Sequence, residues 1–175
     1  MLDNEEYAKR VRRHSLDESK HSTMFITALK LTFPGVLDHV DDETRKKIDE
    51  MQPKYSLARH PPIEKVPFEE RLFELESIDQ LIQVHITEIR ALVLQYMVRE
   101  AFIKHAPEKN LQKLMNISDI LIRDEARHIN YSAEIFEHYA TIPGNKDYFF
   151  QTFEDRLNDF NLLTQEEIDR EEIEL

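Results

Sequence analysis

The pentapeptide DESKH, Asp17 to His21, returns later in the chain as DEARH, Asp124 to His128. On an α-helix, residues three apart lie on one face, so Glu18 would project together with His21, and Glu125 with His128. A carboxylate beside an imidazole is a common ligand pair for first-row metals. The repeat therefore predicts two halves of one metal site, and two solvated charge clusters are the alternative.

The sequence around both copies predicts long helices, because Pro and Gly occur at few positions. The chain has seven Pro and two Gly, and both residue types are unfavourable inside helices. Three stretches without interior Pro or Gly carry apolar residues at helical spacing: 3 to 33, 67 to 106 and 108 to 142. A shorter stretch, 146 to 162, is a fourth candidate. We therefore predict an all-α bundle.

The breaks between these stretches predict how the helices are connected. The first should end at Phe33, because Pro34 disfavours helix in the residue before it and Gly35 suits a turn. A connector over 34 to 66, with a short helix within 41 to 51, is long enough to cross the bundle and make the first two long helices parallel. The break at Ala106–Pro107 predicts an antiparallel hairpin.

Composition and charge exclude several classes of protein. A net charge of -12 argues against nucleic acid as a partner, and no apolar run is long enough to cross a membrane. The absence of Cys excludes thiolate metal sites, so any metal must be bound by His, Asp and Glu. With no apolar leader at the N-terminus, we expect a cytoplasmic protein. We expect one helical domain, 1 to 163, followed by an acidic C-terminal tail, 164 to 175, which is a solvated helix end or a frayed tail rather than an interaction motif.

The predicted hairpin brings a third carboxylate to the second repeat. Glu88 and Glu125 are equally far from the hairpin break, so an antiparallel pair would hold them at one height. Buried Glu is rare unless it is paired or binds a metal. The alternative for Glu88 is an ion pair with Arg99 or a surface position. His85 would be level with His128 by the same count, either as a ligand or as a hydrogen-bonded core histidine.

The repeated motif resembles the ferritin-like dinuclear iron carboxylate superfamily, in particular the bacterial multicomponent monooxygenase hydroxylases and the ribonucleotide reductase small subunit. Those proteins present Glu, then Glu-x-x-His, then Glu after a crossover, then Glu-x-x-His, from four helices. The resemblance implies five metal ligands: Glu18, His21, Glu88, Glu125 and His128. It also implies that Glu18 and Glu125 bridge two metals, and that Asp17 and Asp124 hydrogen-bond the ligand histidines.

The sequence departs from the pattern of this superfamily in two places. The first family helix and its carboxylate have no counterpart, and the alternatives are Glu154 near the C-terminus, a partner chain or a longer N-terminus. Phe25 stands where the reductases have a radical tyrosine, which argues against a reductase. We expect Tyr96 and Tyr131 to be core tyrosines rather than redox relays.

Together, the motif and the resemblance predict a ferritin-like helical bundle whose first helix is absent or replaced. The implied cofactor is two iron ions, or manganese and iron. The implied activity is an oxidase or oxygenase that activates dioxygen on a small organic substrate. The alternatives are metal storage, ferroxidase activity or a non-catalytic metal-binding helical protein. A bundle lacking one helix exposes apolar surface, so we expect a homodimer.

Overall fold

A computed structural model describes residues 5 to 174 with the exception of 52 to 74. The described residues are helical and contain no strand, so the all-α prediction is confirmed. The elements, in chain order, are α1 (Glu5–Thr32), the 3-10 helix η1 (Val36–His39), α2 (Asp42–Met51), α4 (Leu75–His105), α5 (Glu108–Thr141) and α6 (Asn145–Glu174).

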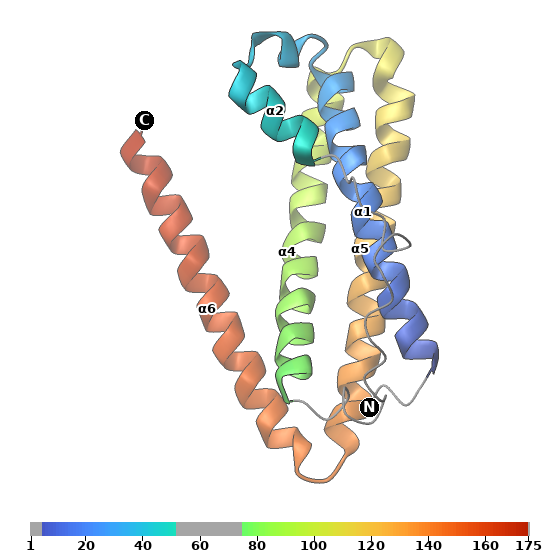
Figure 1. Cartoon of the computed structure of the whole chain (residues 1–175), viewed down its shortest axis with the longest axis vertical. Coiled ribbons are helices and arrows are strands. Elements are labelled where there is room, and N and C mark those ends of the chain that lie inside the picture. The colour runs from blue at the N-terminus through green and yellow to red at the C-terminus, as the bar shows by residue number, and fades with distance from the viewer. Residues whose placement is uncertain (1–4, 52–74, 175) are drawn as a thin grey trace.

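The long helices form a bundle in which α5 contacts each of the other three (Figure 1). Helices α1 and α4 run in the same direction, and α5 runs opposite to both. Helix α6 turns back from the end of α5 and diverges from α4 toward its own C-terminus. The predicted parallel direction of α1 and α4 and the predicted α4–α5 hairpin are therefore present, while residues 52 to 66 of the predicted connector lie outside the described residues.

Local sequence accounts for the described helix ends. Gly35, just after Pro34, has a φ of 83°, a left-handed conformation that glycine adopts without strain. Asp41 precedes α2 and caps it, with its Oδ1 atom 2.8 Å from the backbone nitrogen of Thr44. Pro107 precedes α5 at the break in the hairpin. The predicted helix start at Pro67 lies outside the described residues.

The apolar core is divided into two clusters by a polar layer. One cluster joins α4 and α5 and consists of Ile78, Ile82, Ile86, Tyr131, Ile135, Phe136 and Tyr139. The other joins α1 and α5 and consists of Ala28, Leu114, Ile117 and Leu121. On α5, Asp124, Glu125 and His128 lie between the two clusters and are buried. The second pentapeptide therefore crosses the protein interior.

Helix α6 extends beyond the predicted stretch 146 to 162 into the acidic tail, which agrees with a solvated helix end rather than a frayed tail. Residues 164 to 174, expected as a separate acidic tail, continue the helix that starts at Asn145. The first half of α6 is anchored to the bundle. Arg156 makes a two-pronged ion pair with Asp79 of α4 at 2.6 and 2.7 Å, and Phe153 packs on the α4–α5 cluster.

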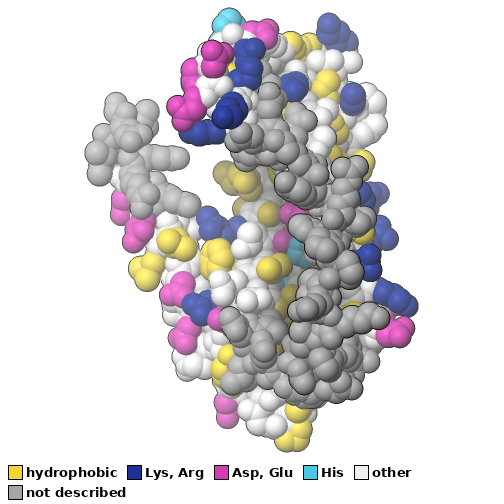
Figure 2. Space-filling view, viewed as in Figure 1, with side chains coloured by type: hydrophobic (Ala, Val, Ile, Leu, Met, Phe, Trp, Pro, Cys, Tyr) yellow, Lys and Arg dark blue, Asp and Glu magenta, His cyan; other side chains and the backbone are white. Residues whose placement is uncertain are grey.

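Apolar side chains are exposed where α6 and α4 diverge, and Figure 2 shows them along α6. On α6 these residues are Leu157, Leu162, Leu163 and Ile168. On α4 they are Ile89, Val93, Leu94, Tyr96 and Met97. The expectation that Tyr96 is a core tyrosine is therefore wrong, since it is 57% exposed. Tyr131 is in the core, as expected.

Glu88 interacts with Glu125, as equal distances from the break predict, but other contacts across the α4–α5 hairpin lie one turn further along α5. Glu88 also approaches His128, and His85 approaches Ser132. Side chains tilt toward the N-terminus of their own helix, so those on α4 tilt away from the connection and those on α5 tilt toward it. An α4 side chain can therefore meet an α5 residue that lies further from the connection. The prediction that Glu88 faces the second motif still holds.

Candidate metal centre

Six side chains from three helices converge in the polar layer. They form two groups whose ligand atoms lie within 4.8 Å of one another. The first group consists of His14, Glu18, Glu88 and His128, and the second of Glu18, His21 and Glu125. Five of the six residues are buried, whereas the Glu18 side chain is 48% exposed. Glu18 belongs to both groups.

Two carboxylates stand between the two repeat histidines. His21 Nδ1 lies 3.0 Å from Glu18 Oε1 and 3.4 Å from Glu125 Oε1. His128 Nδ1 lies 3.7 Å from Glu18 Oε1 and 3.6 Å from Glu125 Oε2. Each carboxylate can therefore reach a cation beside either imidazole, the arrangement that bridging requires.

Glu88 lies on one side of this arrangement, together with a histidine that the sequence analysis did not select. Glu88 Oε2 is 3.2 Å from His128 Nδ1, and Glu88 Oε1 is 3.0 Å from His14 Nε2. The His14 ring stacks on the His128 ring with centroids 3.7 Å apart. The alternative ion pair between Glu88 and Arg99 is not formed, because Arg99 pairs with Asp119.

His14 was detectable from the sequence. It precedes Glu18 by four residues and His21 by seven, so all three lie on one face of α1. Only the DExxH half of this longer motif repeats, so the repeat alone gives no role to His14. Its carboxylate-facing Nε2 atom supplies the first group with a second imidazole.

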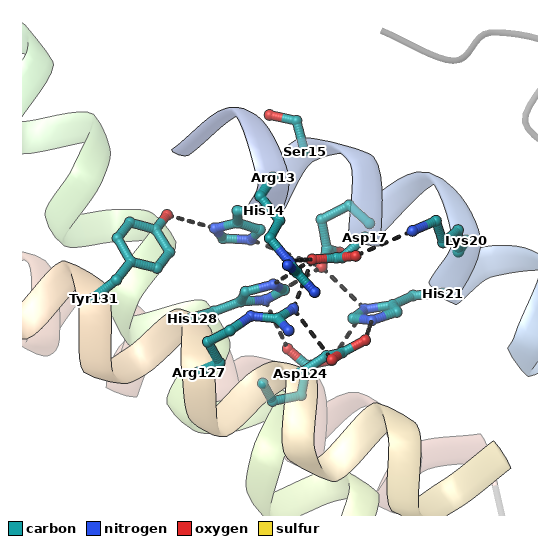
Figure 3. A network of polar contacts seen from close by, with 12 residues as sticks. Arg13, His14, Ser15, Asp17, Lys20, His21, Asp124, Arg127, His128 and Tyr131 are labelled. Carbon is teal, nitrogen blue, oxygen red and sulfur yellow. Dashed lines mark hydrogen bonds and ion pairs between the residues drawn. The ribbon is translucent and has the colours of Figure 1, made fainter. Parts of the chain in front are cut away.

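Each aspartate of the repeat lies beside the repeat histidine of the other helix. Asp124 Oδ2 on α5 is 3.4 Å from His21 Nε2 on α1, and Asp17 Oδ2 on α1 is 3.7 Å from His128 Nε2 on α5. Each histidine therefore has the glutamates at one nitrogen and the opposite aspartate at the other (Figure 3). A carboxylate behind an imidazole fixes the direction of the ring and increases its basicity as a ligand.

The basic residue of each pentapeptide binds these aspartates. Arg127 reaches Asp17 Oδ2 at 2.6 Å and Asp124 Oδ1 at 3.1 Å, and it lies between the two in Figure 3. Lys20 lies 3.3 Å from Asp17. Burial alone would raise the pKa of Asp17, but Lys20 and Arg127 hold it below its usual range. Each residue type in the repeated pattern thus has a partner.

In the metal-free chain, protonated histidines offset the negative charge of the buried glutamates. Burial alone would lower the pKa of His21, but the facing carboxylates of Glu125 and Glu18 raise it to about 10. Burial acts in the same direction on His128, and Glu125 and Glu88 raise its pKa to about 9. Burial would raise the pKa of Glu88, but His128 and His14 hold it well below its usual range. Protons therefore supply the positive charge in the metal-free chain.

One buried atom tests whether these residues fit a metal. His21 Nδ1 faces the oxygens of Glu18 and Glu125, yet it has no well-aligned hydrogen-bond partner among the described residues. A cation at this point would interact with all three side chains. Oxygen and imidazole donors without sulfur suit iron and manganese, so the residues present fit the dinuclear centre that the resemblance implies.

The two further candidates do not join the groups. His85 is buried, and its Nδ1 atom is 2.6 Å from Ser132 Oγ. Burial lowers the pKa of His85, so it remains a neutral core histidine. Glu154 is exposed on α6. Neither belongs to a ligand group of the described residues. Glu154, one of the three alternatives for the missing first-helix carboxylate, therefore lies outside both groups.

A pocket of about 540 Å³ opens beside the first group. Side chains of α1, α4, α5 and α6 line it, among them the apolar Val11, Leu81, Val84 and Phe160. His14, Glu18, Glu88 and Tyr131 form its inner end. Figure 2 shows acidic and histidine side chains in the hollow between α4 and α1. The candidate ligand atoms are therefore next to a mostly apolar space.

Comparisons with known proteins add no evidence about the site. No protein-family model, curated protein or solved structure matches the chain. None of the described helices combines the length and apolar character that a membrane crossing requires. The interpretation therefore rests on the residues themselves, that is, on their donor atoms, their burial and the symmetry of their contacts.

Proposed function

We propose that this chain binds a dinuclear centre of iron, or of manganese and iron, and uses it to activate dioxygen for the oxidation of a small organic substrate. The observation that carries the proposal is the placement of Glu18 and Glu125, each of which approaches both His21 and His128. Two isolated charge clusters would have no reason to share both carboxylates.

In this proposal the two ligand groups hold one ion each. His14, Glu88 and His128 would hold one ion and His21 the other. Glu18 and Glu125, which lie near both His21 and His128, would be shared between the two ions. When bound, the metals supply the redox chemistry and the Lewis acidity that dioxygen activation needs. The protein contributes three carboxylates that offset the metal charge. Asp124 hydrogen-bonds the His21 ring, and Asp17 lies within ion-pair distance of the His128 ring, at 3.7 Å.

The pocket supports substrate oxidation over metal storage. Its apolar walls at Val11, Leu81 and Val84 offer a surface for the apolar part of a substrate next to Glu88 and His14. Small-molecule sites combine an apolar lining with few polar groups in this way. One observation favours a second function, ferroxidase activity or storage: the half-exposed Glu18 gives ions a route from solvent to both groups.

Anaerobic loading with Fe(II), followed by mixing with dioxygen, tests the proposal. We expect two Fe(II) per chain and an absorbance change that depends on both iron and dioxygen. In the Glu125→Ala variant we expect the loss of at least one ion and of that change, because one bridging carboxylate is gone. Asp119→Ala, an exposed acidic change on the same helix, should behave as the parent does.

The same mixing experiment separates oxidation from storage. A storage protein would keep taking up iron beyond two ions per chain and would form a mineral, whereas the proposed oxidase would stop at two. Unchanged iron binding in Glu125→Ala would contradict the assigned centre.

A further inference from the structure

A buried tyrosine, Tyr131, hydrogen-bonds the ring nitrogen of His14 that faces away from the carboxylates. Tyr131 Oη lies 2.6 Å from His14 Nδ1, and the dashed line between them in Figure 3 points away from the metal-binding groups. The other ring nitrogen, Nε2, lies 3.0 Å from Glu88 Oε1 and 3.7 Å from Glu18 Oε1. His14 therefore has one nitrogen directed to the carboxylates and one to a phenol.

This arrangement restricts which nitrogen can carry the proton. A neutral imidazole has one N–H group and one lone pair. If Nε2 is to bind a metal with its lone pair, the proton must be on Nδ1, and Nδ1 must donate it to an acceptor. The Tyr131 oxygen is that acceptor. Its own hydroxyl hydrogen can turn into the adjoining pocket, which Tyr131 lines.

Tyr131 is well placed to hold this geometry. It is 4% exposed and belongs to the apolar cluster of α4 and α5, so packing restricts its ring. Burial raises the pKa of Tyr131, so the hydroxyl stays neutral. His21 and His128 have an aspartate at the corresponding nitrogen. His14 is the one histidine of the two groups whose outer partner is uncharged.

We infer that Tyr131 is a positioning residue that fixes the metal-binding tautomer of His14, the third imidazole of the centre. This inference rests on the proposed function, because it assigns His14 a metal. It extends that function because the affinity for one ion, the one assigned to His14, Glu88 and His128, would depend on the Tyr131 hydroxyl, which lies outside both ligand groups.

Titration of the metal-free full chain with Co(II), without oxygen, tests the inference. Calorimetry gives the affinity of each ion, and the visible absorption of Co(II) reports its coordination. For Tyr131→Phe we expect the dissociation constant of one ion to be about tenfold larger and that of the other to be unchanged. Loss of a hydrogen-bond partner behind a ligating histidine lowers metal affinity by about this factor. Tyr139→Phe is the matched control, because Tyr139 is buried in the same cluster on the same helix.

A double-mutant cycle links the effect to His14. His14→Ala should weaken the same ion, and Tyr131→Phe combined with His14→Ala should be no weaker than His14→Ala alone. Parent-like binding of both ions by Tyr131→Phe, or additive losses in the double variant, would overturn the inference and leave the proposed function intact. A parent chain that binds fewer than two ions would overturn both. Circular dichroism confirms that each variant remains helical.

Discussion

At the scale of single residues, the centre is a set of buried charges that would be costly unless paired. An isolated carboxylate or imidazolium in a protein interior costs several kcal/mol. Here Glu88 faces His14 and His128, and Glu125 faces His21 and His128. Two repeated pentapeptides thus provide compensating charges without a metal, and a metal can replace the protons.

The first prediction at this scale concerns pH and the metal-free chain. The folded-state pKa values of His21 and His128, about 10 and about 9, are above the ordinary 6.5. Their protonation therefore stabilises the fold fully below about pH 6.5, and this stabilisation is lost as pH rises through 9 to 10. We expect the melting temperature to fall by roughly 5 °C between pH 7 and 10, measured by circular dichroism.

The loaded protein provides the control for this prediction. Metal binds the deprotonated imidazoles, so the gap in melting temperature between loaded and metal-free chains should widen over the same interval. A metal-free melting temperature that stays flat from pH 7 to 10 would show that the two histidines are not held as ion pairs.

The second prediction concerns the crossed aspartates. Asp124→Asn removes the carboxylate behind His21 and weakens its hold on the ring. We expect the affinity for the ion beside His21 to fall about tenfold, with the helix content unchanged. Metal titration measures this loss. The matched change Asp119→Asn, at an exposed position on the same helix, should leave affinity as it is.

At the scale of elements, the sequence predicted the features that depend on neighbouring residues alone, namely helix ends and the faces of single helices. Pro34, Gly35 and Pro107 fixed the ends and connections of α1 and α5, because these residues act through their own backbone. The DExxH spacing predicted that Glu and His share a face. The contacts of Glu88 with His128 and of His85 with Ser132 were missed because equal counting ignores the tilt of side chains. His14 was missed because only one repeat contains it.

The extent of α6 was not predictable from its apolar pattern. Residues 164 to 174 carry few apolar side chains, so hydrophobic periodicity gives no signal there. The segment is nevertheless helical and lies beyond the part of α6 that Phe153 and Arg156 anchor. Charged residues form helix well when a packed segment provides the first turns.

Two phenylalanines on α6 test whether the first part of this helix is anchored to the bundle. Phe153→Ala removes a ring that packs on the α4–α5 cluster, and we expect the free energy of unfolding to fall by roughly 2 kcal/mol. Phe150 is 56% exposed on the same helix, so Phe150→Ala should change it by less than about 0.5 kcal/mol. Urea unfolding measures both. Equal losses would mean that α6 is not anchored through Phe153.

At the scale of the whole molecule, an apolar face of α4 continues from the core to the surface. Ile78, Ile82 and Ile86 are buried, and Ile89 and Val93 continue the same face at helical spacing but are 41% and 56% exposed. The change coincides with the divergence of α6 in Figure 1. The sequence predicted exposed apolar surface on an incomplete bundle, but it did not locate this surface.

We expect a second copy of the chain to cover this face, as the predicted homodimer requires. Replacement of Val93 and Met97 by Glu places charge where apolar contact is needed and should convert the dimer to monomer in sedimentation equilibrium. Ile120→Glu is a control on α5 at an exposed apolar position. A parent chain that sediments as a monomer would contradict the prediction.

The central claim is that the polar layer holds two metal ions bridged by Glu18 and Glu125. The most direct test is a crystal structure of the chain loaded anaerobically with Fe(II), with anomalous scattering measured at the iron edge. We predict two anomalous peaks in the interior, one beside His14, Glu88 and His128 and one beside His21. A map with no interior peak, or with iron bound only at surface carboxylates, would contradict the account.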